Sequence, residues 1–62
     1  MKYREILKQL RRDGWVLIHV GGSHRQLRHP TKPGKVTVPG HPRDEIPPKI
    51  LKSIRRQAGW EV

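Results

Sequence analysis

WVLIHVGGSHRQLRHPTKPGKVTVP, residues 15–39, is the stretch that decides the fold, because it contains three short runs typical of β-strands. The first run, Trp15–Val20, is rich in β-branched and aromatic residues, which favours a strand. The second and third runs are His24–His29 and Lys35–Val38, and Pro39 closes the third. Glycine, serine and proline residues fill both intervals. Turns this short cannot carry a crossover connection, so the sequence predicts an antiparallel three-stranded meander.

An amphipathic segment precedes this stretch. Residues 2–12 are expected to form a helix, because their apolar side chains recur at helical spacing: Tyr3, Ile6, Leu7 and Leu10. Asp13-Gly14 ends the pattern, and Gly14 suits the left-handed conformation that commonly follows a helix. The apolar stripe of this helix needs a surface to cover it.

A second amphipathic segment follows the stretch. A helix is predicted to begin at about Pro47 or Pro48, with Gly59 just past its end. Asp44-Glu45 precedes it, where the helix dipole favours negative charge. Trp60 is expected to fold back onto the core. Because each helix has one apolar face, both must pack on the same face of the sheet, and the predicted fold class is α+β in the order α-β-β-β-α.

The strands differ in what their two faces carry. The first is largely apolar on both faces, so it is expected to lie in the centre of the sheet. Alternation in the other two predicts that Leu27, Val36 and Val38 face the helices. The opposite, outward face then carries polar and cationic side chains: His24, Gln26, Arg28, Lys35 and Thr37.

Length and charge limit what the chain can do. Its 62 residues are room for one domain, so residues 1–62 are expected to form a single unit. It has 14 Lys or Arg and 5 Asp or Glu residues, a net charge of +9, and a pI of about 11.3. Such a charge predicts RNA, DNA or an acidic protein as partner. The absence of cysteine excludes disulfides, a thiolate nucleophile and cysteine-bound zinc.

No stretch approaches the roughly 20 apolar residues of a membrane span. The first residues lead into an amphipathic segment rather than a signal peptide. We therefore expect no membrane association and a cytoplasmic location.

The Gly21-Gly22-Ser23-His24 turn is the sharpest local feature. Its glycines let the backbone approach an anion closely, and Ser23 adds a hydrogen-bond donor. His24 can give or take a proton near neutral pH. Together these groups suit cleavage of RNA by its own 2′-hydroxyl. Taken alone, the same residues more often form a structural turn.

The other histidines have simpler interpretations. His19 lies in an apolar run and is expected to be packed or partly buried, and His29 is expected to be a turn residue. His41 is either structural, which we favour, or a second proton carrier if its linker folds over the sheet. No histidine pair has the helical spacing of a zinc site, and the acids do not cluster as a two-metal nuclease requires. The sequence predicts no metal and no cofactor.

The basic side chains of the second helix form a stripe opposite its apolar face: Lys49, Lys52 and Arg56. Stripes of this kind bind phosphates without reading sequence. A solvated helix face is the alternative, but few acids intervene here to neutralise the stripe.

Several short motifs follow one another along the chain in a specific order and spacing: Asp13-Gly14-Trp15, Gly22-Ser23-His24, His29-Pro30, Val36-Thr37-Val38-Pro39, His41, Leu51-Lys52-Ser53-Ile54 and Gln57-Ala58-Gly59. In these motifs the chain resembles the HicA family of bacterial toxins, which are messenger-RNA interferases. The resemblance implies a fold like that of double-stranded-RNA-binding domains. It also implies mRNA cleavage with one catalytic histidine, His24, and a HicB-type antitoxin that blocks the active site.

Residues and resemblance together predict a metal-independent endoribonuclease toxin with His24 as general acid or base. Gly22 and Ser23 are expected to shape the loop and hold the phosphate. The predicted RNA-binding residues are Gln26, Arg28, Lys35, Lys49, Lys52 and Arg56.

Two other functions stay open. A non-catalytic double-stranded-RNA-binding module would bind by shape and have no need of His24. A small DNA-binding regulator would read base edges with its last helix, but that helix begins without Asn or Gln and exposes mostly Lys and Arg.

Overall fold

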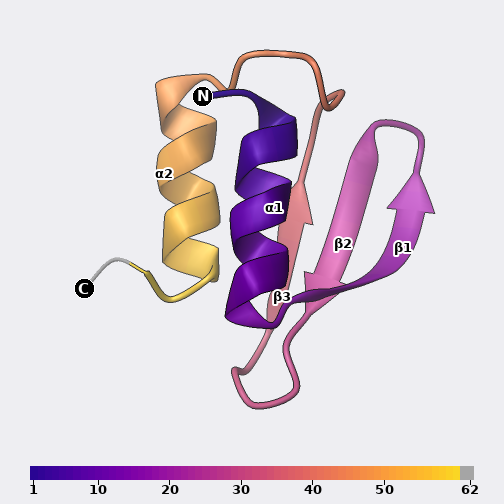
Figure 1. Ribbon diagram of the computed structural model, residues 1–62, viewed down its shortest axis with the longest axis vertical. Coiled ribbons are helices and arrows are strands. Elements are labelled where there is room, and N and C mark those ends of the chain that lie inside the picture. The colour runs from indigo at the N-terminus through magenta and orange to yellow at the C-terminus, as the bar shows by residue number, and fades with distance from the viewer. Residues whose placement is uncertain (61–62) are drawn as a thin grey trace.

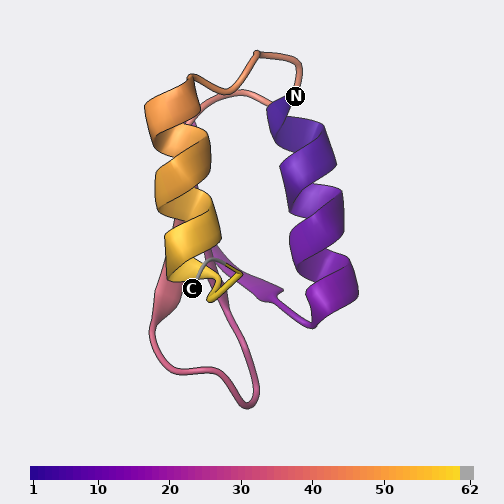
Figure 2. The ribbon, with the colours of Figure 1, turned by 90° about the vertical axis from the view of Figure 1, so that its left-hand side faces the viewer.

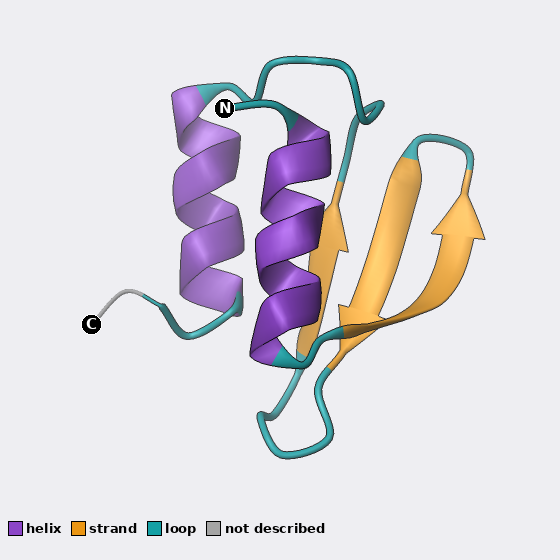
Figure 3. Ribbon diagram, in the orientation of Figure 1, coloured by secondary structure: helices purple, strands orange, loops and turns teal. Residues whose placement is uncertain are grey.

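The computed structural model describes residues 1–60 and has the predicted element order (Figures 1 and 3). The elements are α1 (Tyr3–Asp13), β1 (Val16–Gly21), β2 (His24–Arg28), β3 (Lys35–Val38) and α2 (Pro48–Gln57). Their ends lie within a residue or so of the predicted ones. The fold is therefore the α+β fold of double-stranded-RNA-binding domains, with two helices on one face of the sheet (Figure 2).

The three strands form an antiparallel sheet in the order β1-β2-β3. The prediction that the first strand is central is wrong, because two hairpins in succession place the middle strand of the chain in the middle of the sheet. Every residue of β1 is exposed, and β1 is the strand farthest from the helices (Figure 1). The apolar side chains of β1 are therefore not part of the core of this domain.

The core lies between the helices and the strands β2 and β3. Leu27, Val36 and Val38 are at most 1% exposed, which confirms that they face the helices. The other buried side chains come from both helices and the adjoining segments: Tyr3, Ile6, Leu10, Trp15, Ile46, Ile54 and Ala58. Trp60 packs against this core, as predicted.

The acids ahead of α2 do not serve its N-terminus as predicted. The first turn of α2 contains no acid, and the Glu45 carboxylate instead accepts a hydrogen bond from the Met1 amino group at 3.1 Å. The Tyr3 N–H donates to the Asp44 carbonyl at 3.1 Å, and the Arg4 N–H donates to the Pro42 carbonyl at 3.0 Å. The linker between β3 and α2 is therefore bound to the start of α1.

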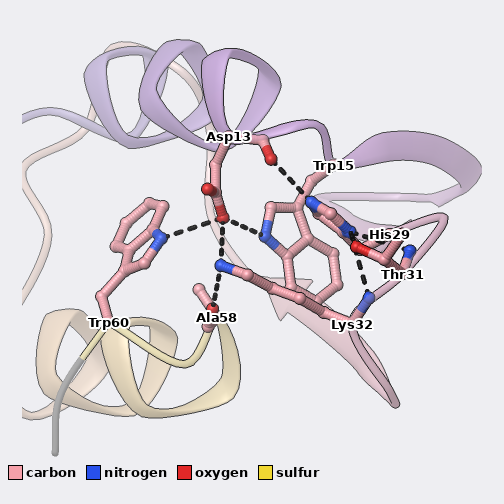
Figure 4. A network of polar contacts seen from close by, with 7 residues as sticks. All are labelled: Asp13, Trp15, His29, Thr31, Lys32, Ala58 and Trp60. Atoms are coloured by element: carbon pink, nitrogen blue, oxygen red, sulfur yellow. Dashed lines mark hydrogen bonds and ion pairs between the residues drawn. The ribbon is translucent and has the colours of Figure 1, made fainter.

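The Asp13 carboxylate joins three parts of the fold (Figure 4). Its Oδ2 accepts hydrogen bonds from the Trp15 and Trp60 indole N–H groups, each at 3.0 Å, and from Lys32 Nζ at 2.6 Å. The Asp13 carbonyl lies 2.6 Å from His29 Nε2. Sequence reasoning had given Asp13 only a part in ending a helix. The network connects the end of α1, the β2–β3 loop and the residues after α2.

Acid should weaken the fold through this network. The Lys32 hydrogen bond, followed by that of Trp60, lowers the pKa of Asp13 from 3.8 to about 2. The folded state thus binds this proton less readily than the unfolded chain, so the stabilisation is complete above about pH 4 and is lost as the pH falls towards 2. We expect Asp13→Asn to reduce the loss of stability between pH 5 and pH 2.5, measured as the urea midpoint. The control Asp44→Asn should lose as much stability between pH 5 and pH 2.5 as wild type. If Asp13→Asn also loses as much as wild type, the Asp13 carboxylate is not the cause of the acid sensitivity.

The exposed apolar side chains of β1 predict self-association at high concentration. Val16, Ile18 and Val20 are 50–58% exposed, and β1 has no charged residue to protect its free edge. Ile18→Lys should reduce light scattering of concentrated protein while changing the free energy of unfolding by less than about 0.5 kcal/mol. Gln9→Lys adds the same charge on α1, so an equal reduction there would show that net charge, not the edge, is responsible.

Candidate nucleic-acid interface

The β1–β2 turn places His24 at the start of β2. Gly21 pairs with His24 across the hairpin, which leaves Gly22 and Ser23 as a two-residue turn. Gly22 has φ +58°, and no non-glycine residue among those described has a positive φ. A positive φ at the first turn residue alone is the pattern of a type II′ turn, where glycine is favoured. The side chain of His24 is exposed.

The outward face of the sheet brings together four of the predicted site residues. Leu27 points to the core, so its neighbours Gln26 and Arg28 point the other way, as does His24. Gln26 pairs with Thr37, and Arg28 pairs with Lys35. Two cations directly opposite one another repel. This face therefore carries positive charge that a bound anion would neutralise, beside an accessible histidine.

The basic stripe of α2 does not share that face. Lys49, Lys52 and Arg56 are all exposed, but α2 covers the opposite face of the sheet (Figure 2). Lys49 lies in the first turn of α2, at the same end of the molecule as the β1–β2 turn, and Arg56 lies towards the other end (Figure 1). The predicted binding residues thus form two surfaces.

His19 is exposed, so the prediction that it is packed is wrong. The register shifts by one residue between Leu17 and His19, and His19 pairs with the outward-facing Gln26. Strict alternation from Leu17 would have turned His19 towards the helices. The β-bulge reverses it, and nothing in the sequence pattern signalled an inserted residue at Ile18.

The remaining histidines, His29 and His41, lie outside the strands. His29 Nδ1 accepts hydrogen bonds from the Thr31 and Lys32 N–H groups, each at 3.1 Å, which confirms its turn role and leaves Nε2 as the donor to Asp13. His41 follows Gly40, whose N–H donates to the Ser23 carbonyl at 3.0 Å. His41 itself is exposed, on the linker that is bound to α1.

The described residues offer no prepared metal site. Within residues 1–60, no group of three or more histidine, aspartate or glutamate side chains is placed to hold an ion. The surface of this part of the chain has no pocket. Neither described helix is long and apolar enough to cross a membrane.

Comparison with protein families decides the relationship. The family model for the HicA toxin of bacterial toxin–antitoxin systems matches residues 3–60. The chain belongs to the HicA toxin family. No curated protein matches the chain. Because a HicA toxin is one half of a toxin–antitoxin pair, membership implies an antitoxin partner.

The family match spans both surfaces of this HicA chain. It includes the β1–β2 turn, the outward sheet face and the basic stripe of α2. It also includes the Asp13 network, which lies at the end of the molecule opposite the β1–β2 turn (Figures 1 and 4). The Asp13 network is therefore distant from the β1–β2 turn, whereas Arg28 and Lys35 lie at the same end of the sheet as the network.

Proposed function

We propose that this HicA chain is an endoribonuclease toxin that cleaves mRNA without a metal ion, with His24 as its proton carrier. One observation carries the proposal: an exposed histidine shares an open sheet face with the opposed cations Arg28 and Lys35. An RNA backbone placed on this face would relieve the repulsion between the two cations. It would also bring a phosphodiester to a group that can move protons near neutral pH.

The chemistry uses groups of the RNA and of this chain, together with water. The 2′-oxygen attacks the adjacent phosphorus, the bond to the 5′-oxygen breaks, and a 2′,3′-cyclic phosphate and a 5′-hydroxyl remain. His24 takes the proton of the 2′-hydroxyl or supplies one to the leaving 5′-oxygen, and the other of these two protons is exchanged with water. Gly22 and Ser23 offer hydrogen-bond donors to the reacting phosphate. Arg28 and Lys35, at the other end of β2, bind neighbouring phosphates of the RNA backbone and position the RNA.

Binding draws on the wider surface. Gln26 lies between His24 and Arg28 on the same face and can donate to the RNA backbone or a base. Lys49, Lys52 and Arg56 attract RNA from another side of the molecule, which raises association rates and makes affinity depend on salt. The net charge of +9 suits RNA and also an acidic protein partner. We propose that the protein partner is a HicB-type antitoxin. We also propose that residues 1–62 form one domain and that the protein acts in the cytoplasm.

Cleavage in a chelator tests the proposal. The purified chain is incubated with an mRNA transcript in excess EDTA, and the ends of the fragments are determined. We expect fragments that end in 2′,3′-cyclic phosphate. A requirement for added divalent metal, or the absence of cleavage, would overturn the proposal. Shape-dependent binding of an RNA duplex without cleavage would favour the RNA-binding module instead.

A further inference from the structure

A second histidine lies beside His24 on the outward sheet face. In β1 and β2, Gly21 pairs with His24 and His19 pairs with Gln26. Residues directly opposite in an antiparallel pair point to the same face. His19 is therefore the diagonal neighbour of His24, and diagonal neighbours lie about 7–8 Å apart, within reach of long side chains.

The glycine between them lets the His19 ring lean towards His24. A Cβ atom added to Gly21 would lie 3.2 Å from His19 Nε2 and 3.8 Å from Cδ2, with no other atom within 4 Å outside its chain neighbours. The His19 ring thus extends over Gly21, which is the cross-strand partner of His24. A side chain at position 21 would occupy part of the space that the His19 ring now fills.

The bulge at Ile18 is what makes this arrangement. If Leu17, Ile18 and His19 alternated strictly, without the bulge, His19 would lie on the helix side of β1, away from His24. Bulges often re-aim a side chain beside an active site. Here the bulge brings an exposed imidazole to the face that carries His24, Arg28 and Lys35.

We propose that His19 is the second proton carrier of the RNA-cleaving site. This inference rests on the proposed ribonuclease function. Cleavage moves two protons: one leaves the 2′-hydroxyl as its oxygen bonds to phosphorus, and one joins the 5′-oxygen as its bond to phosphorus breaks. Of the two adjacent histidines, one accepts the first proton in its neutral form, and the other donates the second in its charged form. Solvent then returns both to their starting states.

His41 is less suited to this role than His19, because it lies on a linker outside the sheet. The adjacent Gly40 is held between α1 and the β1–β2 turn: a Cβ atom on it would lie 2.5 Å from the ring of Tyr3, a residue of α1, and its N–H donates to the Ser23 carbonyl at 3.0 Å. The Asp44 N–H also donates to the His41 carbonyl at 3.0 Å, which turns the chain there. His19 instead shares a sheet face with His24 by strand register.

A substrate with a modified leaving group tests the assignment. RNA with one scissile linkage is prepared with either the natural 5′-oxygen or a 5′-bridging sulfur, which departs as a thiolate and needs no proton. On natural RNA, His19→Gln and His24→Gln should each lower kcat/KM by about 10²-fold or more. On the sulfur substrate, the variant that lacks the acid should recover most of the wild-type rate, and the variant that lacks the base should not. His41→Gln, the control, should match wild type on both substrates.

The outcomes separate the two proposals. If wild type fails to cleave RNA, the proposed function and the histidine pair fail together. If wild type cleaves and His19→Gln cleaves equally well, only the inference about His19 is overturned. Loss of rate in both variants with recovery of neither on the sulfur substrate would leave His19 a merely structural part, which also overturns the inference.

Gly21→Ala gives a matched geometric test. Among described atoms, the added methyl group meets only the His19 ring, so it should displace that ring and lower the rate on natural RNA. In a His19→Ala background the same change should have no further effect. An equal loss of rate in both backgrounds would show that Gly21→Ala acts on something other than His19, contrary to the proposal.

Discussion

His24→Gln is expected to lower kcat/KM for RNA cleavage by about 10²- to 10⁴-fold, the usual range for losing a positioned acid or base. Glutamine keeps a polar side chain of similar reach at the start of β2 but cannot take up and release a proton near neutral pH. His24 is exposed and outside the core, so its replacement removes chemistry without removing packing. Initial rates in EDTA give the comparison.

Measurements of RNA affinity and of stability distinguish a loss of catalysis from a loss of binding or folding. His24→Gln should bind RNA within a few-fold of wild type, because the cations Arg28 and Lys35 remain. Its urea midpoint should also be unchanged. A variant purified in the same way that cleaves RNA at the wild-type rate would show that His24 is not the proton carrier, or that a contaminating nuclease supplies the activity.

Gly40→Ala is expected to cause the largest loss of stability among single methyl additions. Gly40 has φ +107°, and a Cβ atom there would lie 2.5 Å from Cε2 and 2.7 Å from Cζ of Tyr3. Tyr3 is only 5% exposed, so its ring has little room to move. Backbone strain and overpacking each cost about 1–3 kcal/mol. Their combined cost of about 2–6 kcal/mol compares with a total stability of about 3–9 kcal/mol for a chain of this length.

Gly34→Ala is the matched control for this contact. Gly34 has φ +80° and no atom within 4 Å of an added Cβ, so its replacement carries backbone strain alone. Urea unfolding followed by tryptophan fluorescence should show a clearly larger loss for Gly40→Ala than for Gly34→Ala. Equal losses of stability in the two variants would mean that the Tyr3 ring does not pack on Gly40, and hence that this contact does not hold the linker against α1.

The sequence was sufficient to predict the helices and strands, and to predict that both helices pack on one face of the sheet. The helical spacing of Tyr3, Ile6 and Leu10 and the alternation around Leu27 depend on neighbours within one or two turns or on adjacent strand positions. Such local patterns also placed His24 at the start of a strand and gave the outward side chains Gln26 and Arg28. The charge excess likewise follows from composition and predicts the class of partner.

Only the tertiary structure determined how β1 is used. Its apolar sequence suggested a central strand, but position in a sheet depends on the order of hairpins and on where the helices pack. Both are long-range properties that no window of sequence contains. The bulge at Ile18 and the convergence of Trp15, Lys32 and Trp60 on Asp13 also depend on contacts between residues far apart in the sequence. The sequence by itself determined the fold class, the basic character and the position of His24 directly after a turn, at the start of a strand. The fold decided that His19 lies beside His24, because one inserted residue in β1 turns its side chain to the other face of the sheet.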